Sequence, residues 1–138
     1  MLSDRELVEE FRAGRMPEGG FHHPEHVRVA WLYLQEKPPL EALQLFVTDL
    51  RAFAQAQGKP DLYHETITLA YFFLINERSE LCQAHSWQEF ALKNSDLVDG
   101  ETRILSQYYS SALLESGLAR KIFILPRWTP EAPDKRVD

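Results

Sequence analysis

The chain has 138 residues, of which 44% are hydrophobic and 26% are charged, and its formal net charge at pH 7 is −6. These values fit one globular domain and exclude a disordered chain, while the negative charge and the lack of a basic run argue against nucleic-acid binding. No apolar stretch is long enough to span a membrane, and a single cysteine excludes an internal disulfide and favours a cytoplasmic protein.

The first predicted helix begins after Ser3. The segment Ser3–Glu6 has the pattern of a capping box, in which the serine and glutamate side chains each accept a hydrogen bond from the other residue's backbone N–H. Leu2 and Leu7 flank this segment at the spacing of a hydrophobic staple. Gly14, with the proline and glycines that follow it, is expected to end the helix in a loop.

A second helix is predicted at the sequence FHHPEH, residues 21–26. Proline is favoured in the first turn of a helix, and the residue before a proline prefers an extended backbone. We therefore expect His23 at the helix cap and His26 in the first turn. The helix must end before Pro38 and Pro39, because a proline lacks the backbone N–H that a helix interior needs.

Two longer helices are predicted in the middle of the chain. Residues 40–57 carry apolar side chains at a helical period, and Gly58 is a suitable left-handed terminator. The next helix is expected to start near Asp61, a good N-cap residue, which puts His64 in its first turn. Its segment 67–75 is almost wholly apolar. Periodicity alone also allows a buried strand there, but the length and the capped start favour a central helix.

The C-terminal part of the chain has weaker signals. Ser86 begins a second capping-box pattern and predicts a short helix, which a polar turn follows at 94–100. A last long helix is expected over 101–116 and would end at Gly117. The apolar stretch 122–125 fits either another helical turn or an extended segment laid over the core.

Together these elements predict an all-α fold. We expect a single domain of five to six helices over residues 1–125, with bundle-like or orthogonal packing, followed by an irregular tail at 126–138. The chain contains no internal repeat and no phosphate-cradling glycine loop, so nucleotide binding has no support.

Histidine is the most suggestive residue type, because three of the five histidines fall at predicted helix starts. If those starts pack side by side, His23, His26 and His64 would be able to ligate one divalent metal ion, zinc or iron. Glu65 would then be a fourth ligand or a general base, and Arg28 would orient an anionic group of a small-molecule substrate. The positive end of a helix also favours a neutral imidazole, which suits both metal binding and proton transfer.

Two motifs resemble those of a family of small, uncharacterised bacterial proteins. The first is FxHxxHVRxA, followed by WxYL, over residues 21–34, and the second is YHETxT over residues 63–68. The resemblance extends over about residues 21–126, and it brings no known activity with it. It implies that the histidines belong to a shared pattern, and it suggests Tyr109 and Arg120 as further residues of a pocket.

Two other functions fit the same residues. One is a metal-free pocket for a small ligand, in which the histidines, Tyr109 and Arg120 make the hydrogen bonds. The other is a non-enzymatic interaction module that forms a homo-oligomer through its aromatic faces. The histidines would then be structural, capping helices and binding backbone carbonyls. A Cys82–His85 pair of nucleophile and base is a weaker candidate, because a lone cysteine is usually a small buried apolar residue.

Overall fold

Residues 1–100 and 103–127 are described by the computed structural model, and all of their regular structure is helical. No strand occurs in these two ranges, which confirms the predicted all-α class. Five of the described helices have seven residues or more, in agreement with the five to six expected. In chain order the elements are α1 (Asp4–Arg12), α2 (His23–Glu36), α3 (Pro39–Ala56), η1 (Pro60–Leu62), α4 (Glu65–Cys82), α5 (Trp87–Lys93), α6 (Ser95–Val98), η3 (Ile104–Gln107), α7 (Ser111–Leu114) and α8 (Gly117–Lys121).

The predicted capping residues begin two of these helices. In α1 the Ser3 hydroxyl accepts a hydrogen bond from the Glu6 backbone N–H at 3.1 Å, and the Glu6 carboxylate accepts one from the Ser3 N–H at 2.9 Å. In α5 the Ser86 hydroxyl accepts from the Glu89 N–H at 3.1 Å. The Glu89 carboxylate binds the His85 N–H instead of the Ser86 N–H. The sequence signal was therefore right about both helix starts, because each depends on side chains within four residues.

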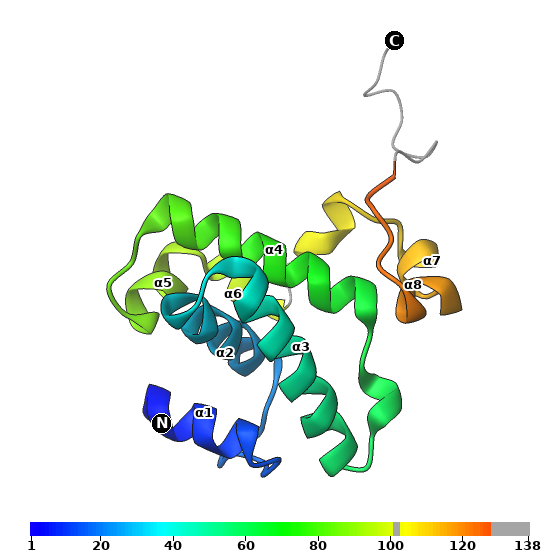
Figure 1. Ribbon diagram of the computed structural model, residues 1–138. Coiled ribbons are helices and arrows are strands. Elements are labelled where there is room, and N and C mark those ends of the chain that lie inside the picture. The colour runs from blue at the N-terminus through cyan, green and yellow to red at the C-terminus, as the bar shows by residue number, and fades with distance from the viewer. Residues whose placement is uncertain (101–102, 128–138) are drawn as a thin grey trace.

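Helices α2, α3 and α4 form the centre of the fold. Helix α2 packs against both α3 and α4, and α1 covers α3 from the other side. Figure 1 shows α4 lying across α2 and α3, with α5 near its C-terminal end and α7 and α8 beside its start. The core between them is rich in aromatic rings, among them Phe11, Trp31, Phe46, Phe72 and Phe90. No helix in the described part of the chain is long and apolar enough to cross a membrane.

The apolar segment 67–75 is helical and lies within α4, as predicted. Its side chains surround the helix instead of forming one stripe, because α4 has neighbours on two sides. Phe72 and Ile75 are buried in the core with α2 and α3. Phe73 lies on the other side, where its ring contacts that of Phe123 at a centroid distance of 6.3 Å. A helix that is apolar all round is expected at such a central position.

The predicted long helix over 101–116 is wrong. The chain forms η3, α7 and α8 there instead, and residues 101–102 lie outside the described ranges. Ser110 begins α7 by accepting a hydrogen bond from the Leu113 N–H, and Ser116 begins α8 by accepting one from the Ala119 N–H. These two serine caps divide the segment into short helices, so Gly117 begins α8 instead of ending a helix. The predicted polar turn at 94–100 likewise contains the one-turn helix α6.

The stretch after α8 is extended and is fixed against α4, which decides between the two alternatives for residues 122–125. The fully buried Thr66 hydroxyl donates a hydrogen bond to the Ile122 carbonyl at 2.8 Å and accepts one from the Ile124 N–H at 3.0 Å. The Tyr109 hydroxyl donates to the Ile124 carbonyl at 2.7 Å. Residues 128–138, most of the predicted tail, lie outside the described ranges.

Candidate functional site

A cavity of about 830 Å³ opens between α2, α3 and α4, and the loop before α2, η1 and α8 complete its wall. Its lining combines two kinds of side chain. Core residues form the apolar part, among them Val27, Ala30, Phe46, Leu50, Phe72 and Ile75. Imidazole, phenol and cationic groups form the polar part, among them His23, His26, Lys59, Tyr63, His64 and Arg120.

The polar lining residues come from several chain segments. They belong to the start of α2, the turn after α3, the start of α4 and helix α8. Figure 1 shows the end of α3, the start of α4 and helix α8 on the same, right-hand side of the molecule. The apolar lining residues lie further along the same helices. From Ile67 to Ile75 the wall follows α4 for about 12 Å at 1.5 Å per residue. The site is a large cavity of mixed lining, and we call the part formed by Lys59, Tyr63 and Arg120 its mouth.

His64 is the N-cap of α4, and both of its ring nitrogens are already used. Nδ1 accepts a hydrogen bond from the Ile67 N–H at 3.1 Å. Nε2 lies 2.7 Å from the Leu114 carbonyl, and a carbonyl only accepts, so Nε2 must carry the proton. The helix was predicted to start near Asp61, but Asp61 lies in η1, and His64 replaces it as the cap. This imidazole holds the start of α4 to the end of α7.

His23 is the first residue of α2, one position later than predicted, because His22 has the extended backbone of the N-cap. Its Nε2 donates a hydrogen bond to the Leu97 carbonyl at 3.0 Å, which joins α2 to α6. Its ring also packs against Tyr71 of α4, at a centroid distance of 4.7 Å. Nδ1 keeps a free lone pair, since no described residue donates a hydrogen bond to it.

His26 is held by packing alone. Its ring lies against Phe21 at a centroid distance of 4.5 Å, and no described residue forms a hydrogen bond with either ring nitrogen. Burial, reinforced by the neighbouring imidazoles of His23 and His22, lowers the pKa of His26 to about 4. His26 is therefore neutral at pH 7, with one N–H donor and one lone pair available to a molecule in the cavity.

The three histidines line one cavity, together with His22, and their ligation of a metal ion stays a prediction. No group of three or more His, Cys, Asp or Glu side chains in residues 1–100 and 103–127 is placed to hold a metal ion. The hydrogen bonds give the reason. Both nitrogens of His64 are used, one nitrogen of His23 is used, and only His26 keeps both free.

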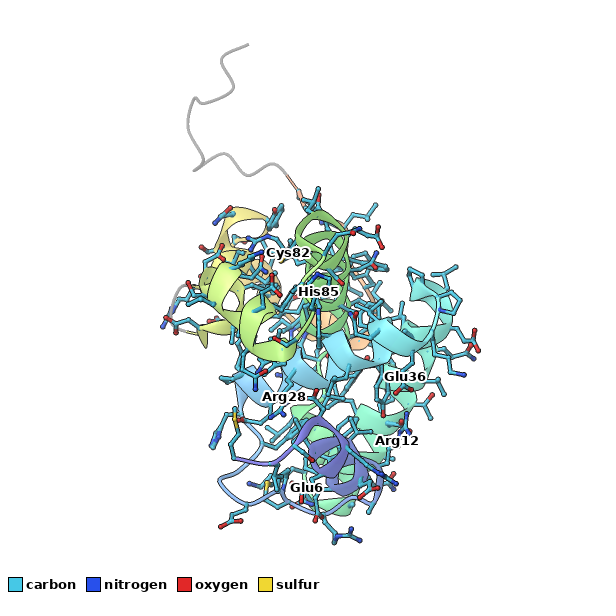
Figure 2. The ribbon with its side chains drawn as sticks, turned by 90° about the vertical axis from the view of Figure 1, so that its left-hand side faces the viewer. Glu6, Arg12, Arg28, Glu36, Cys82 and His85 are labelled. Atoms are coloured by element: carbon cyan, nitrogen blue, oxygen red, sulfur yellow. The ribbon has the colours of Figure 1, made fainter. Side chains whose placement is uncertain are left out.

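Three further residues from the sequence prediction lie outside this cavity. Arg28 is buried beside α1, where it donates hydrogen bonds to the Asp4 carboxylate at 2.7 Å and the Leu2 carbonyl at 2.9 Å. Figure 2 places Arg28 between α2 and α1. The Tyr109 hydroxyl is bound to the extended segment, and this residue lines a separate cavity of about 230 Å³. Glu65 accepts a hydrogen bond from the Tyr63 hydroxyl at 2.6 Å, outside the cavity lining.

The family resemblance suggested Arg120 as a pocket residue, while other lining residues, His22 among them, were not expected there. Arg120 lines the cavity and donates hydrogen bonds to two backbone carbonyls of the η1 segment. Lys59 and Tyr63 line the same mouth and were not singled out for a role. The sequence feature that could have identified them is their position between Gly58, which has a φ of +75°, and His64. A short tight connection between two long helices sets its side chains beside both helix ends.

No match was found when the chain was compared with protein-family models, with curated proteins and with solved structures. Its class is therefore defined by the fold and the site together. It is a small all-α domain with a large, mostly apolar cavity whose lining includes four histidines, His22, His23, His26 and His64.

Proposed function

We propose that the protein binds a small, largely apolar molecule in the cavity between α2, α3 and α4, without a metal ion. The volume of about 830 Å³ is the observation that carries the proposal, because ligand sites usually measure about 300 to 1,000 Å³. Protein interiors are normally close-packed, and an empty apolar cavity costs stability in proportion to its size. A bound apolar molecule would recover the lost packing.

His26 would give this site its polar contact. Its neutral imidazole supplies one donor and one acceptor among apolar neighbours, where a hydrogen bond is stronger than it is in water. A ligand with a single hydroxyl, carbonyl or carboxyl group would satisfy one of these atoms. His23 and His64 would contribute mainly to the shape of the cavity, since their rings are held by the Leu97 and Leu114 carbonyls.

Binding is favoured over catalysis by the composition of the wall. No aspartate or glutamate of residues 1–100 and 103–127 lines the cavity, and Glu65, the candidate general base, binds the Tyr63 hydroxyl outside it. Metal binding is less well supported, because His64 would have to give up both the cap of α4 and its bond to the Leu114 carbonyl. The alternative of a dimerising module stays a prediction that no observation favours.

The experiment is a titration with 1-aminoanthracene, an uncharged apolar dye whose fluorescence rises on burial. Ala54 lines the cavity at the end of α3, so Ala54→Trp should fill part of it and weaken dye binding at least tenfold. Ala52 is exposed on the same helix, and Ala52→Trp is the matched control, expected to stay within twofold of the wild type. Circular dichroism verifies that both variants are folded. Failure of the wild type to bind the dye, or equal binding by both variants, would overturn the proposal.

A further inference from the structure

The mouth of the cavity is positively charged in a protein whose net charge is −6. Among the described residues, two cationic side chains line it, Lys59 and Arg120, and no carboxylate does. Charged side chains that stay outside the lining include the carboxylates of Asp61 and Glu65 and the guanidinium of Arg51, which stacks on the ring of Tyr63 at 4.3 Å from its centroid. The charged groups of the described lining are thus cationic.

Arg120 is fixed in place without being neutralised. Its Nη1 donates hydrogen bonds to the Asp61 carbonyl at 2.6 Å and the Tyr63 carbonyl at 3.2 Å. Carbonyl oxygens hold the guanidinium but carry no formal charge, and no carboxylate of the described residues forms an ion pair with it. The remaining N–H groups of Arg120 are therefore available to a bidentate anion.

Lys59 is placed to act with Arg120. It is exposed, it directly precedes η1, and it forms no ion pair within the described ranges. Lys59 belongs to the short connection between α3 and α4, and two hydrogen bonds hold Arg120 to the same connection. The apolar wall begins beside them, at Ile67 and Phe53, and continues into the core.

From this arrangement we infer that the ligand is an amphipathic anion, whose charged head binds Lys59 and Arg120 while its apolar tail enters the cavity along α4. This inference rests on the proposed function and narrows its ligand to one chemical class. A fatty carboxylate is the simplest member of that class. The wall from Ile67 to Ile75, about 12 Å long, suits a tail of medium length. The cationic mouth also attracts such an anion from solution, which raises its association rate.

The test compares three compounds that share one tail and differ in head charge: dodecanoate, dodecanol and dodecylamine. Each displaces 1-aminoanthracene from the full-length protein. Dodecanoate is expected to bind at least tenfold more tightly than dodecylamine, and added salt should weaken dodecanoate binding but leave dodecanol binding unchanged. Lys59→Glu should lower the dodecanoate affinity about tenfold and change the dodecanol affinity less than twofold.

Lys121→Glu is the matched control, because Lys121 is exposed on α8 next to Arg120 and does not line the cavity. It should leave both affinities within twofold of the wild type. If dodecanol binds but dodecanoate has no advantage over dodecylamine, or if Lys59→Glu affects dodecanoate and dodecanol equally, the inference fails while the proposed function stands. If the dye and all three compounds fail to bind, the proposed function fails with it.

Discussion

Mildly acidic solution should weaken the fold through His26. Burial and the neighbouring imidazoles lower the pKa of this residue from its ordinary value of 6.5 to about 4 in the folded protein. The unfolded chain therefore takes up the proton first as the pH falls. The contribution of neutral His26 to stability is complete above pH 6.5, and it is lost progressively between pH 6.5 and about pH 4.

The size of the effect follows from the same two pKa values. Between pH 7 and pH 5, proton linkage lowers the free energy of unfolding by about 2 kcal/mol, and the full loss below the folded-state pKa is about 3 kcal/mol. For a domain of 138 residues, 2 kcal/mol corresponds to a fall in Tm of about 7 °C.

Urea unfolding at pH 7 and pH 5 measures this loss, followed by the fluorescence of the buried Trp31 and Trp87. His26→Phe retains an aromatic ring against Phe21 but removes the titrating group. The wild type should lose about 2 kcal/mol more than His26→Phe on the change to pH 5. His85→Phe is the matched control, since His85 is exposed, and it should behave as the wild type does.

For each protein, the free energy of unfolding at pH 5 is compared with its own value at pH 7. The effect of the substitution on stability at pH 7 therefore cancels. Equal losses for the wild type and His26→Phe would show that His26 titrates alike in the folded and unfolded states. The lowering of its pKa by burial and by the neighbouring imidazoles would then be wrong.

Three further outcomes are expected. Excess zinc should change the Tm by less than about 1 °C, because His64 has no free nitrogen, and a saturable rise of several degrees would contradict this. Thr66→Val should cost about 2 kcal/mol in urea unfolding, because it leaves two buried backbone groups unpaired, whereas Thr48→Val on an exposed position should cost less than about 0.5 kcal/mol. Asp4→Ala should cost about 2 kcal/mol by leaving the buried Arg28 without its carboxylate, and a loss near zero would contradict that account.

In the helices that the sequence predicted well, residues close to the helix ends determine where those ends lie. The Ser3 and Ser86 caps, and Gly58 after α3, act within a few positions, so their local chemistry decides the outcome. The same approach failed for residues 101–116. Their apolar spacing imitates a helix face, but Ser110 and Ser116 offer caps that split it. The Tyr109 hydroxyl donates a hydrogen bond to the distant Ile124 carbonyl, a contact that the local sequence does not show.

The candidate site shows the same limit at the level of side chains. That His23, His26 and His64 lie at or near helix starts was predictable from nearby residues, and all three line one cavity. What each imidazole can do was not predictable. It depends on the Leu97 and Leu114 carbonyls, which lie 74 and 50 residues further along the chain and reach the histidines only in the folded protein.

Among His23, His26 and His64, His26 is the one that the fold itself does not explain. His64 caps α4 and His23 ties α2 to α6, so both contribute hydrogen bonds to stability. His26 contributes none within the described chain, and it loses its favourable neutral form in acid. A phenylalanine would fill the same space against Phe21 without that liability. A polar residue that makes no hydrogen bond within the core and lowers its stability in acid is typical of a functional site. There the missing hydrogen-bond partner is supplied by a ligand.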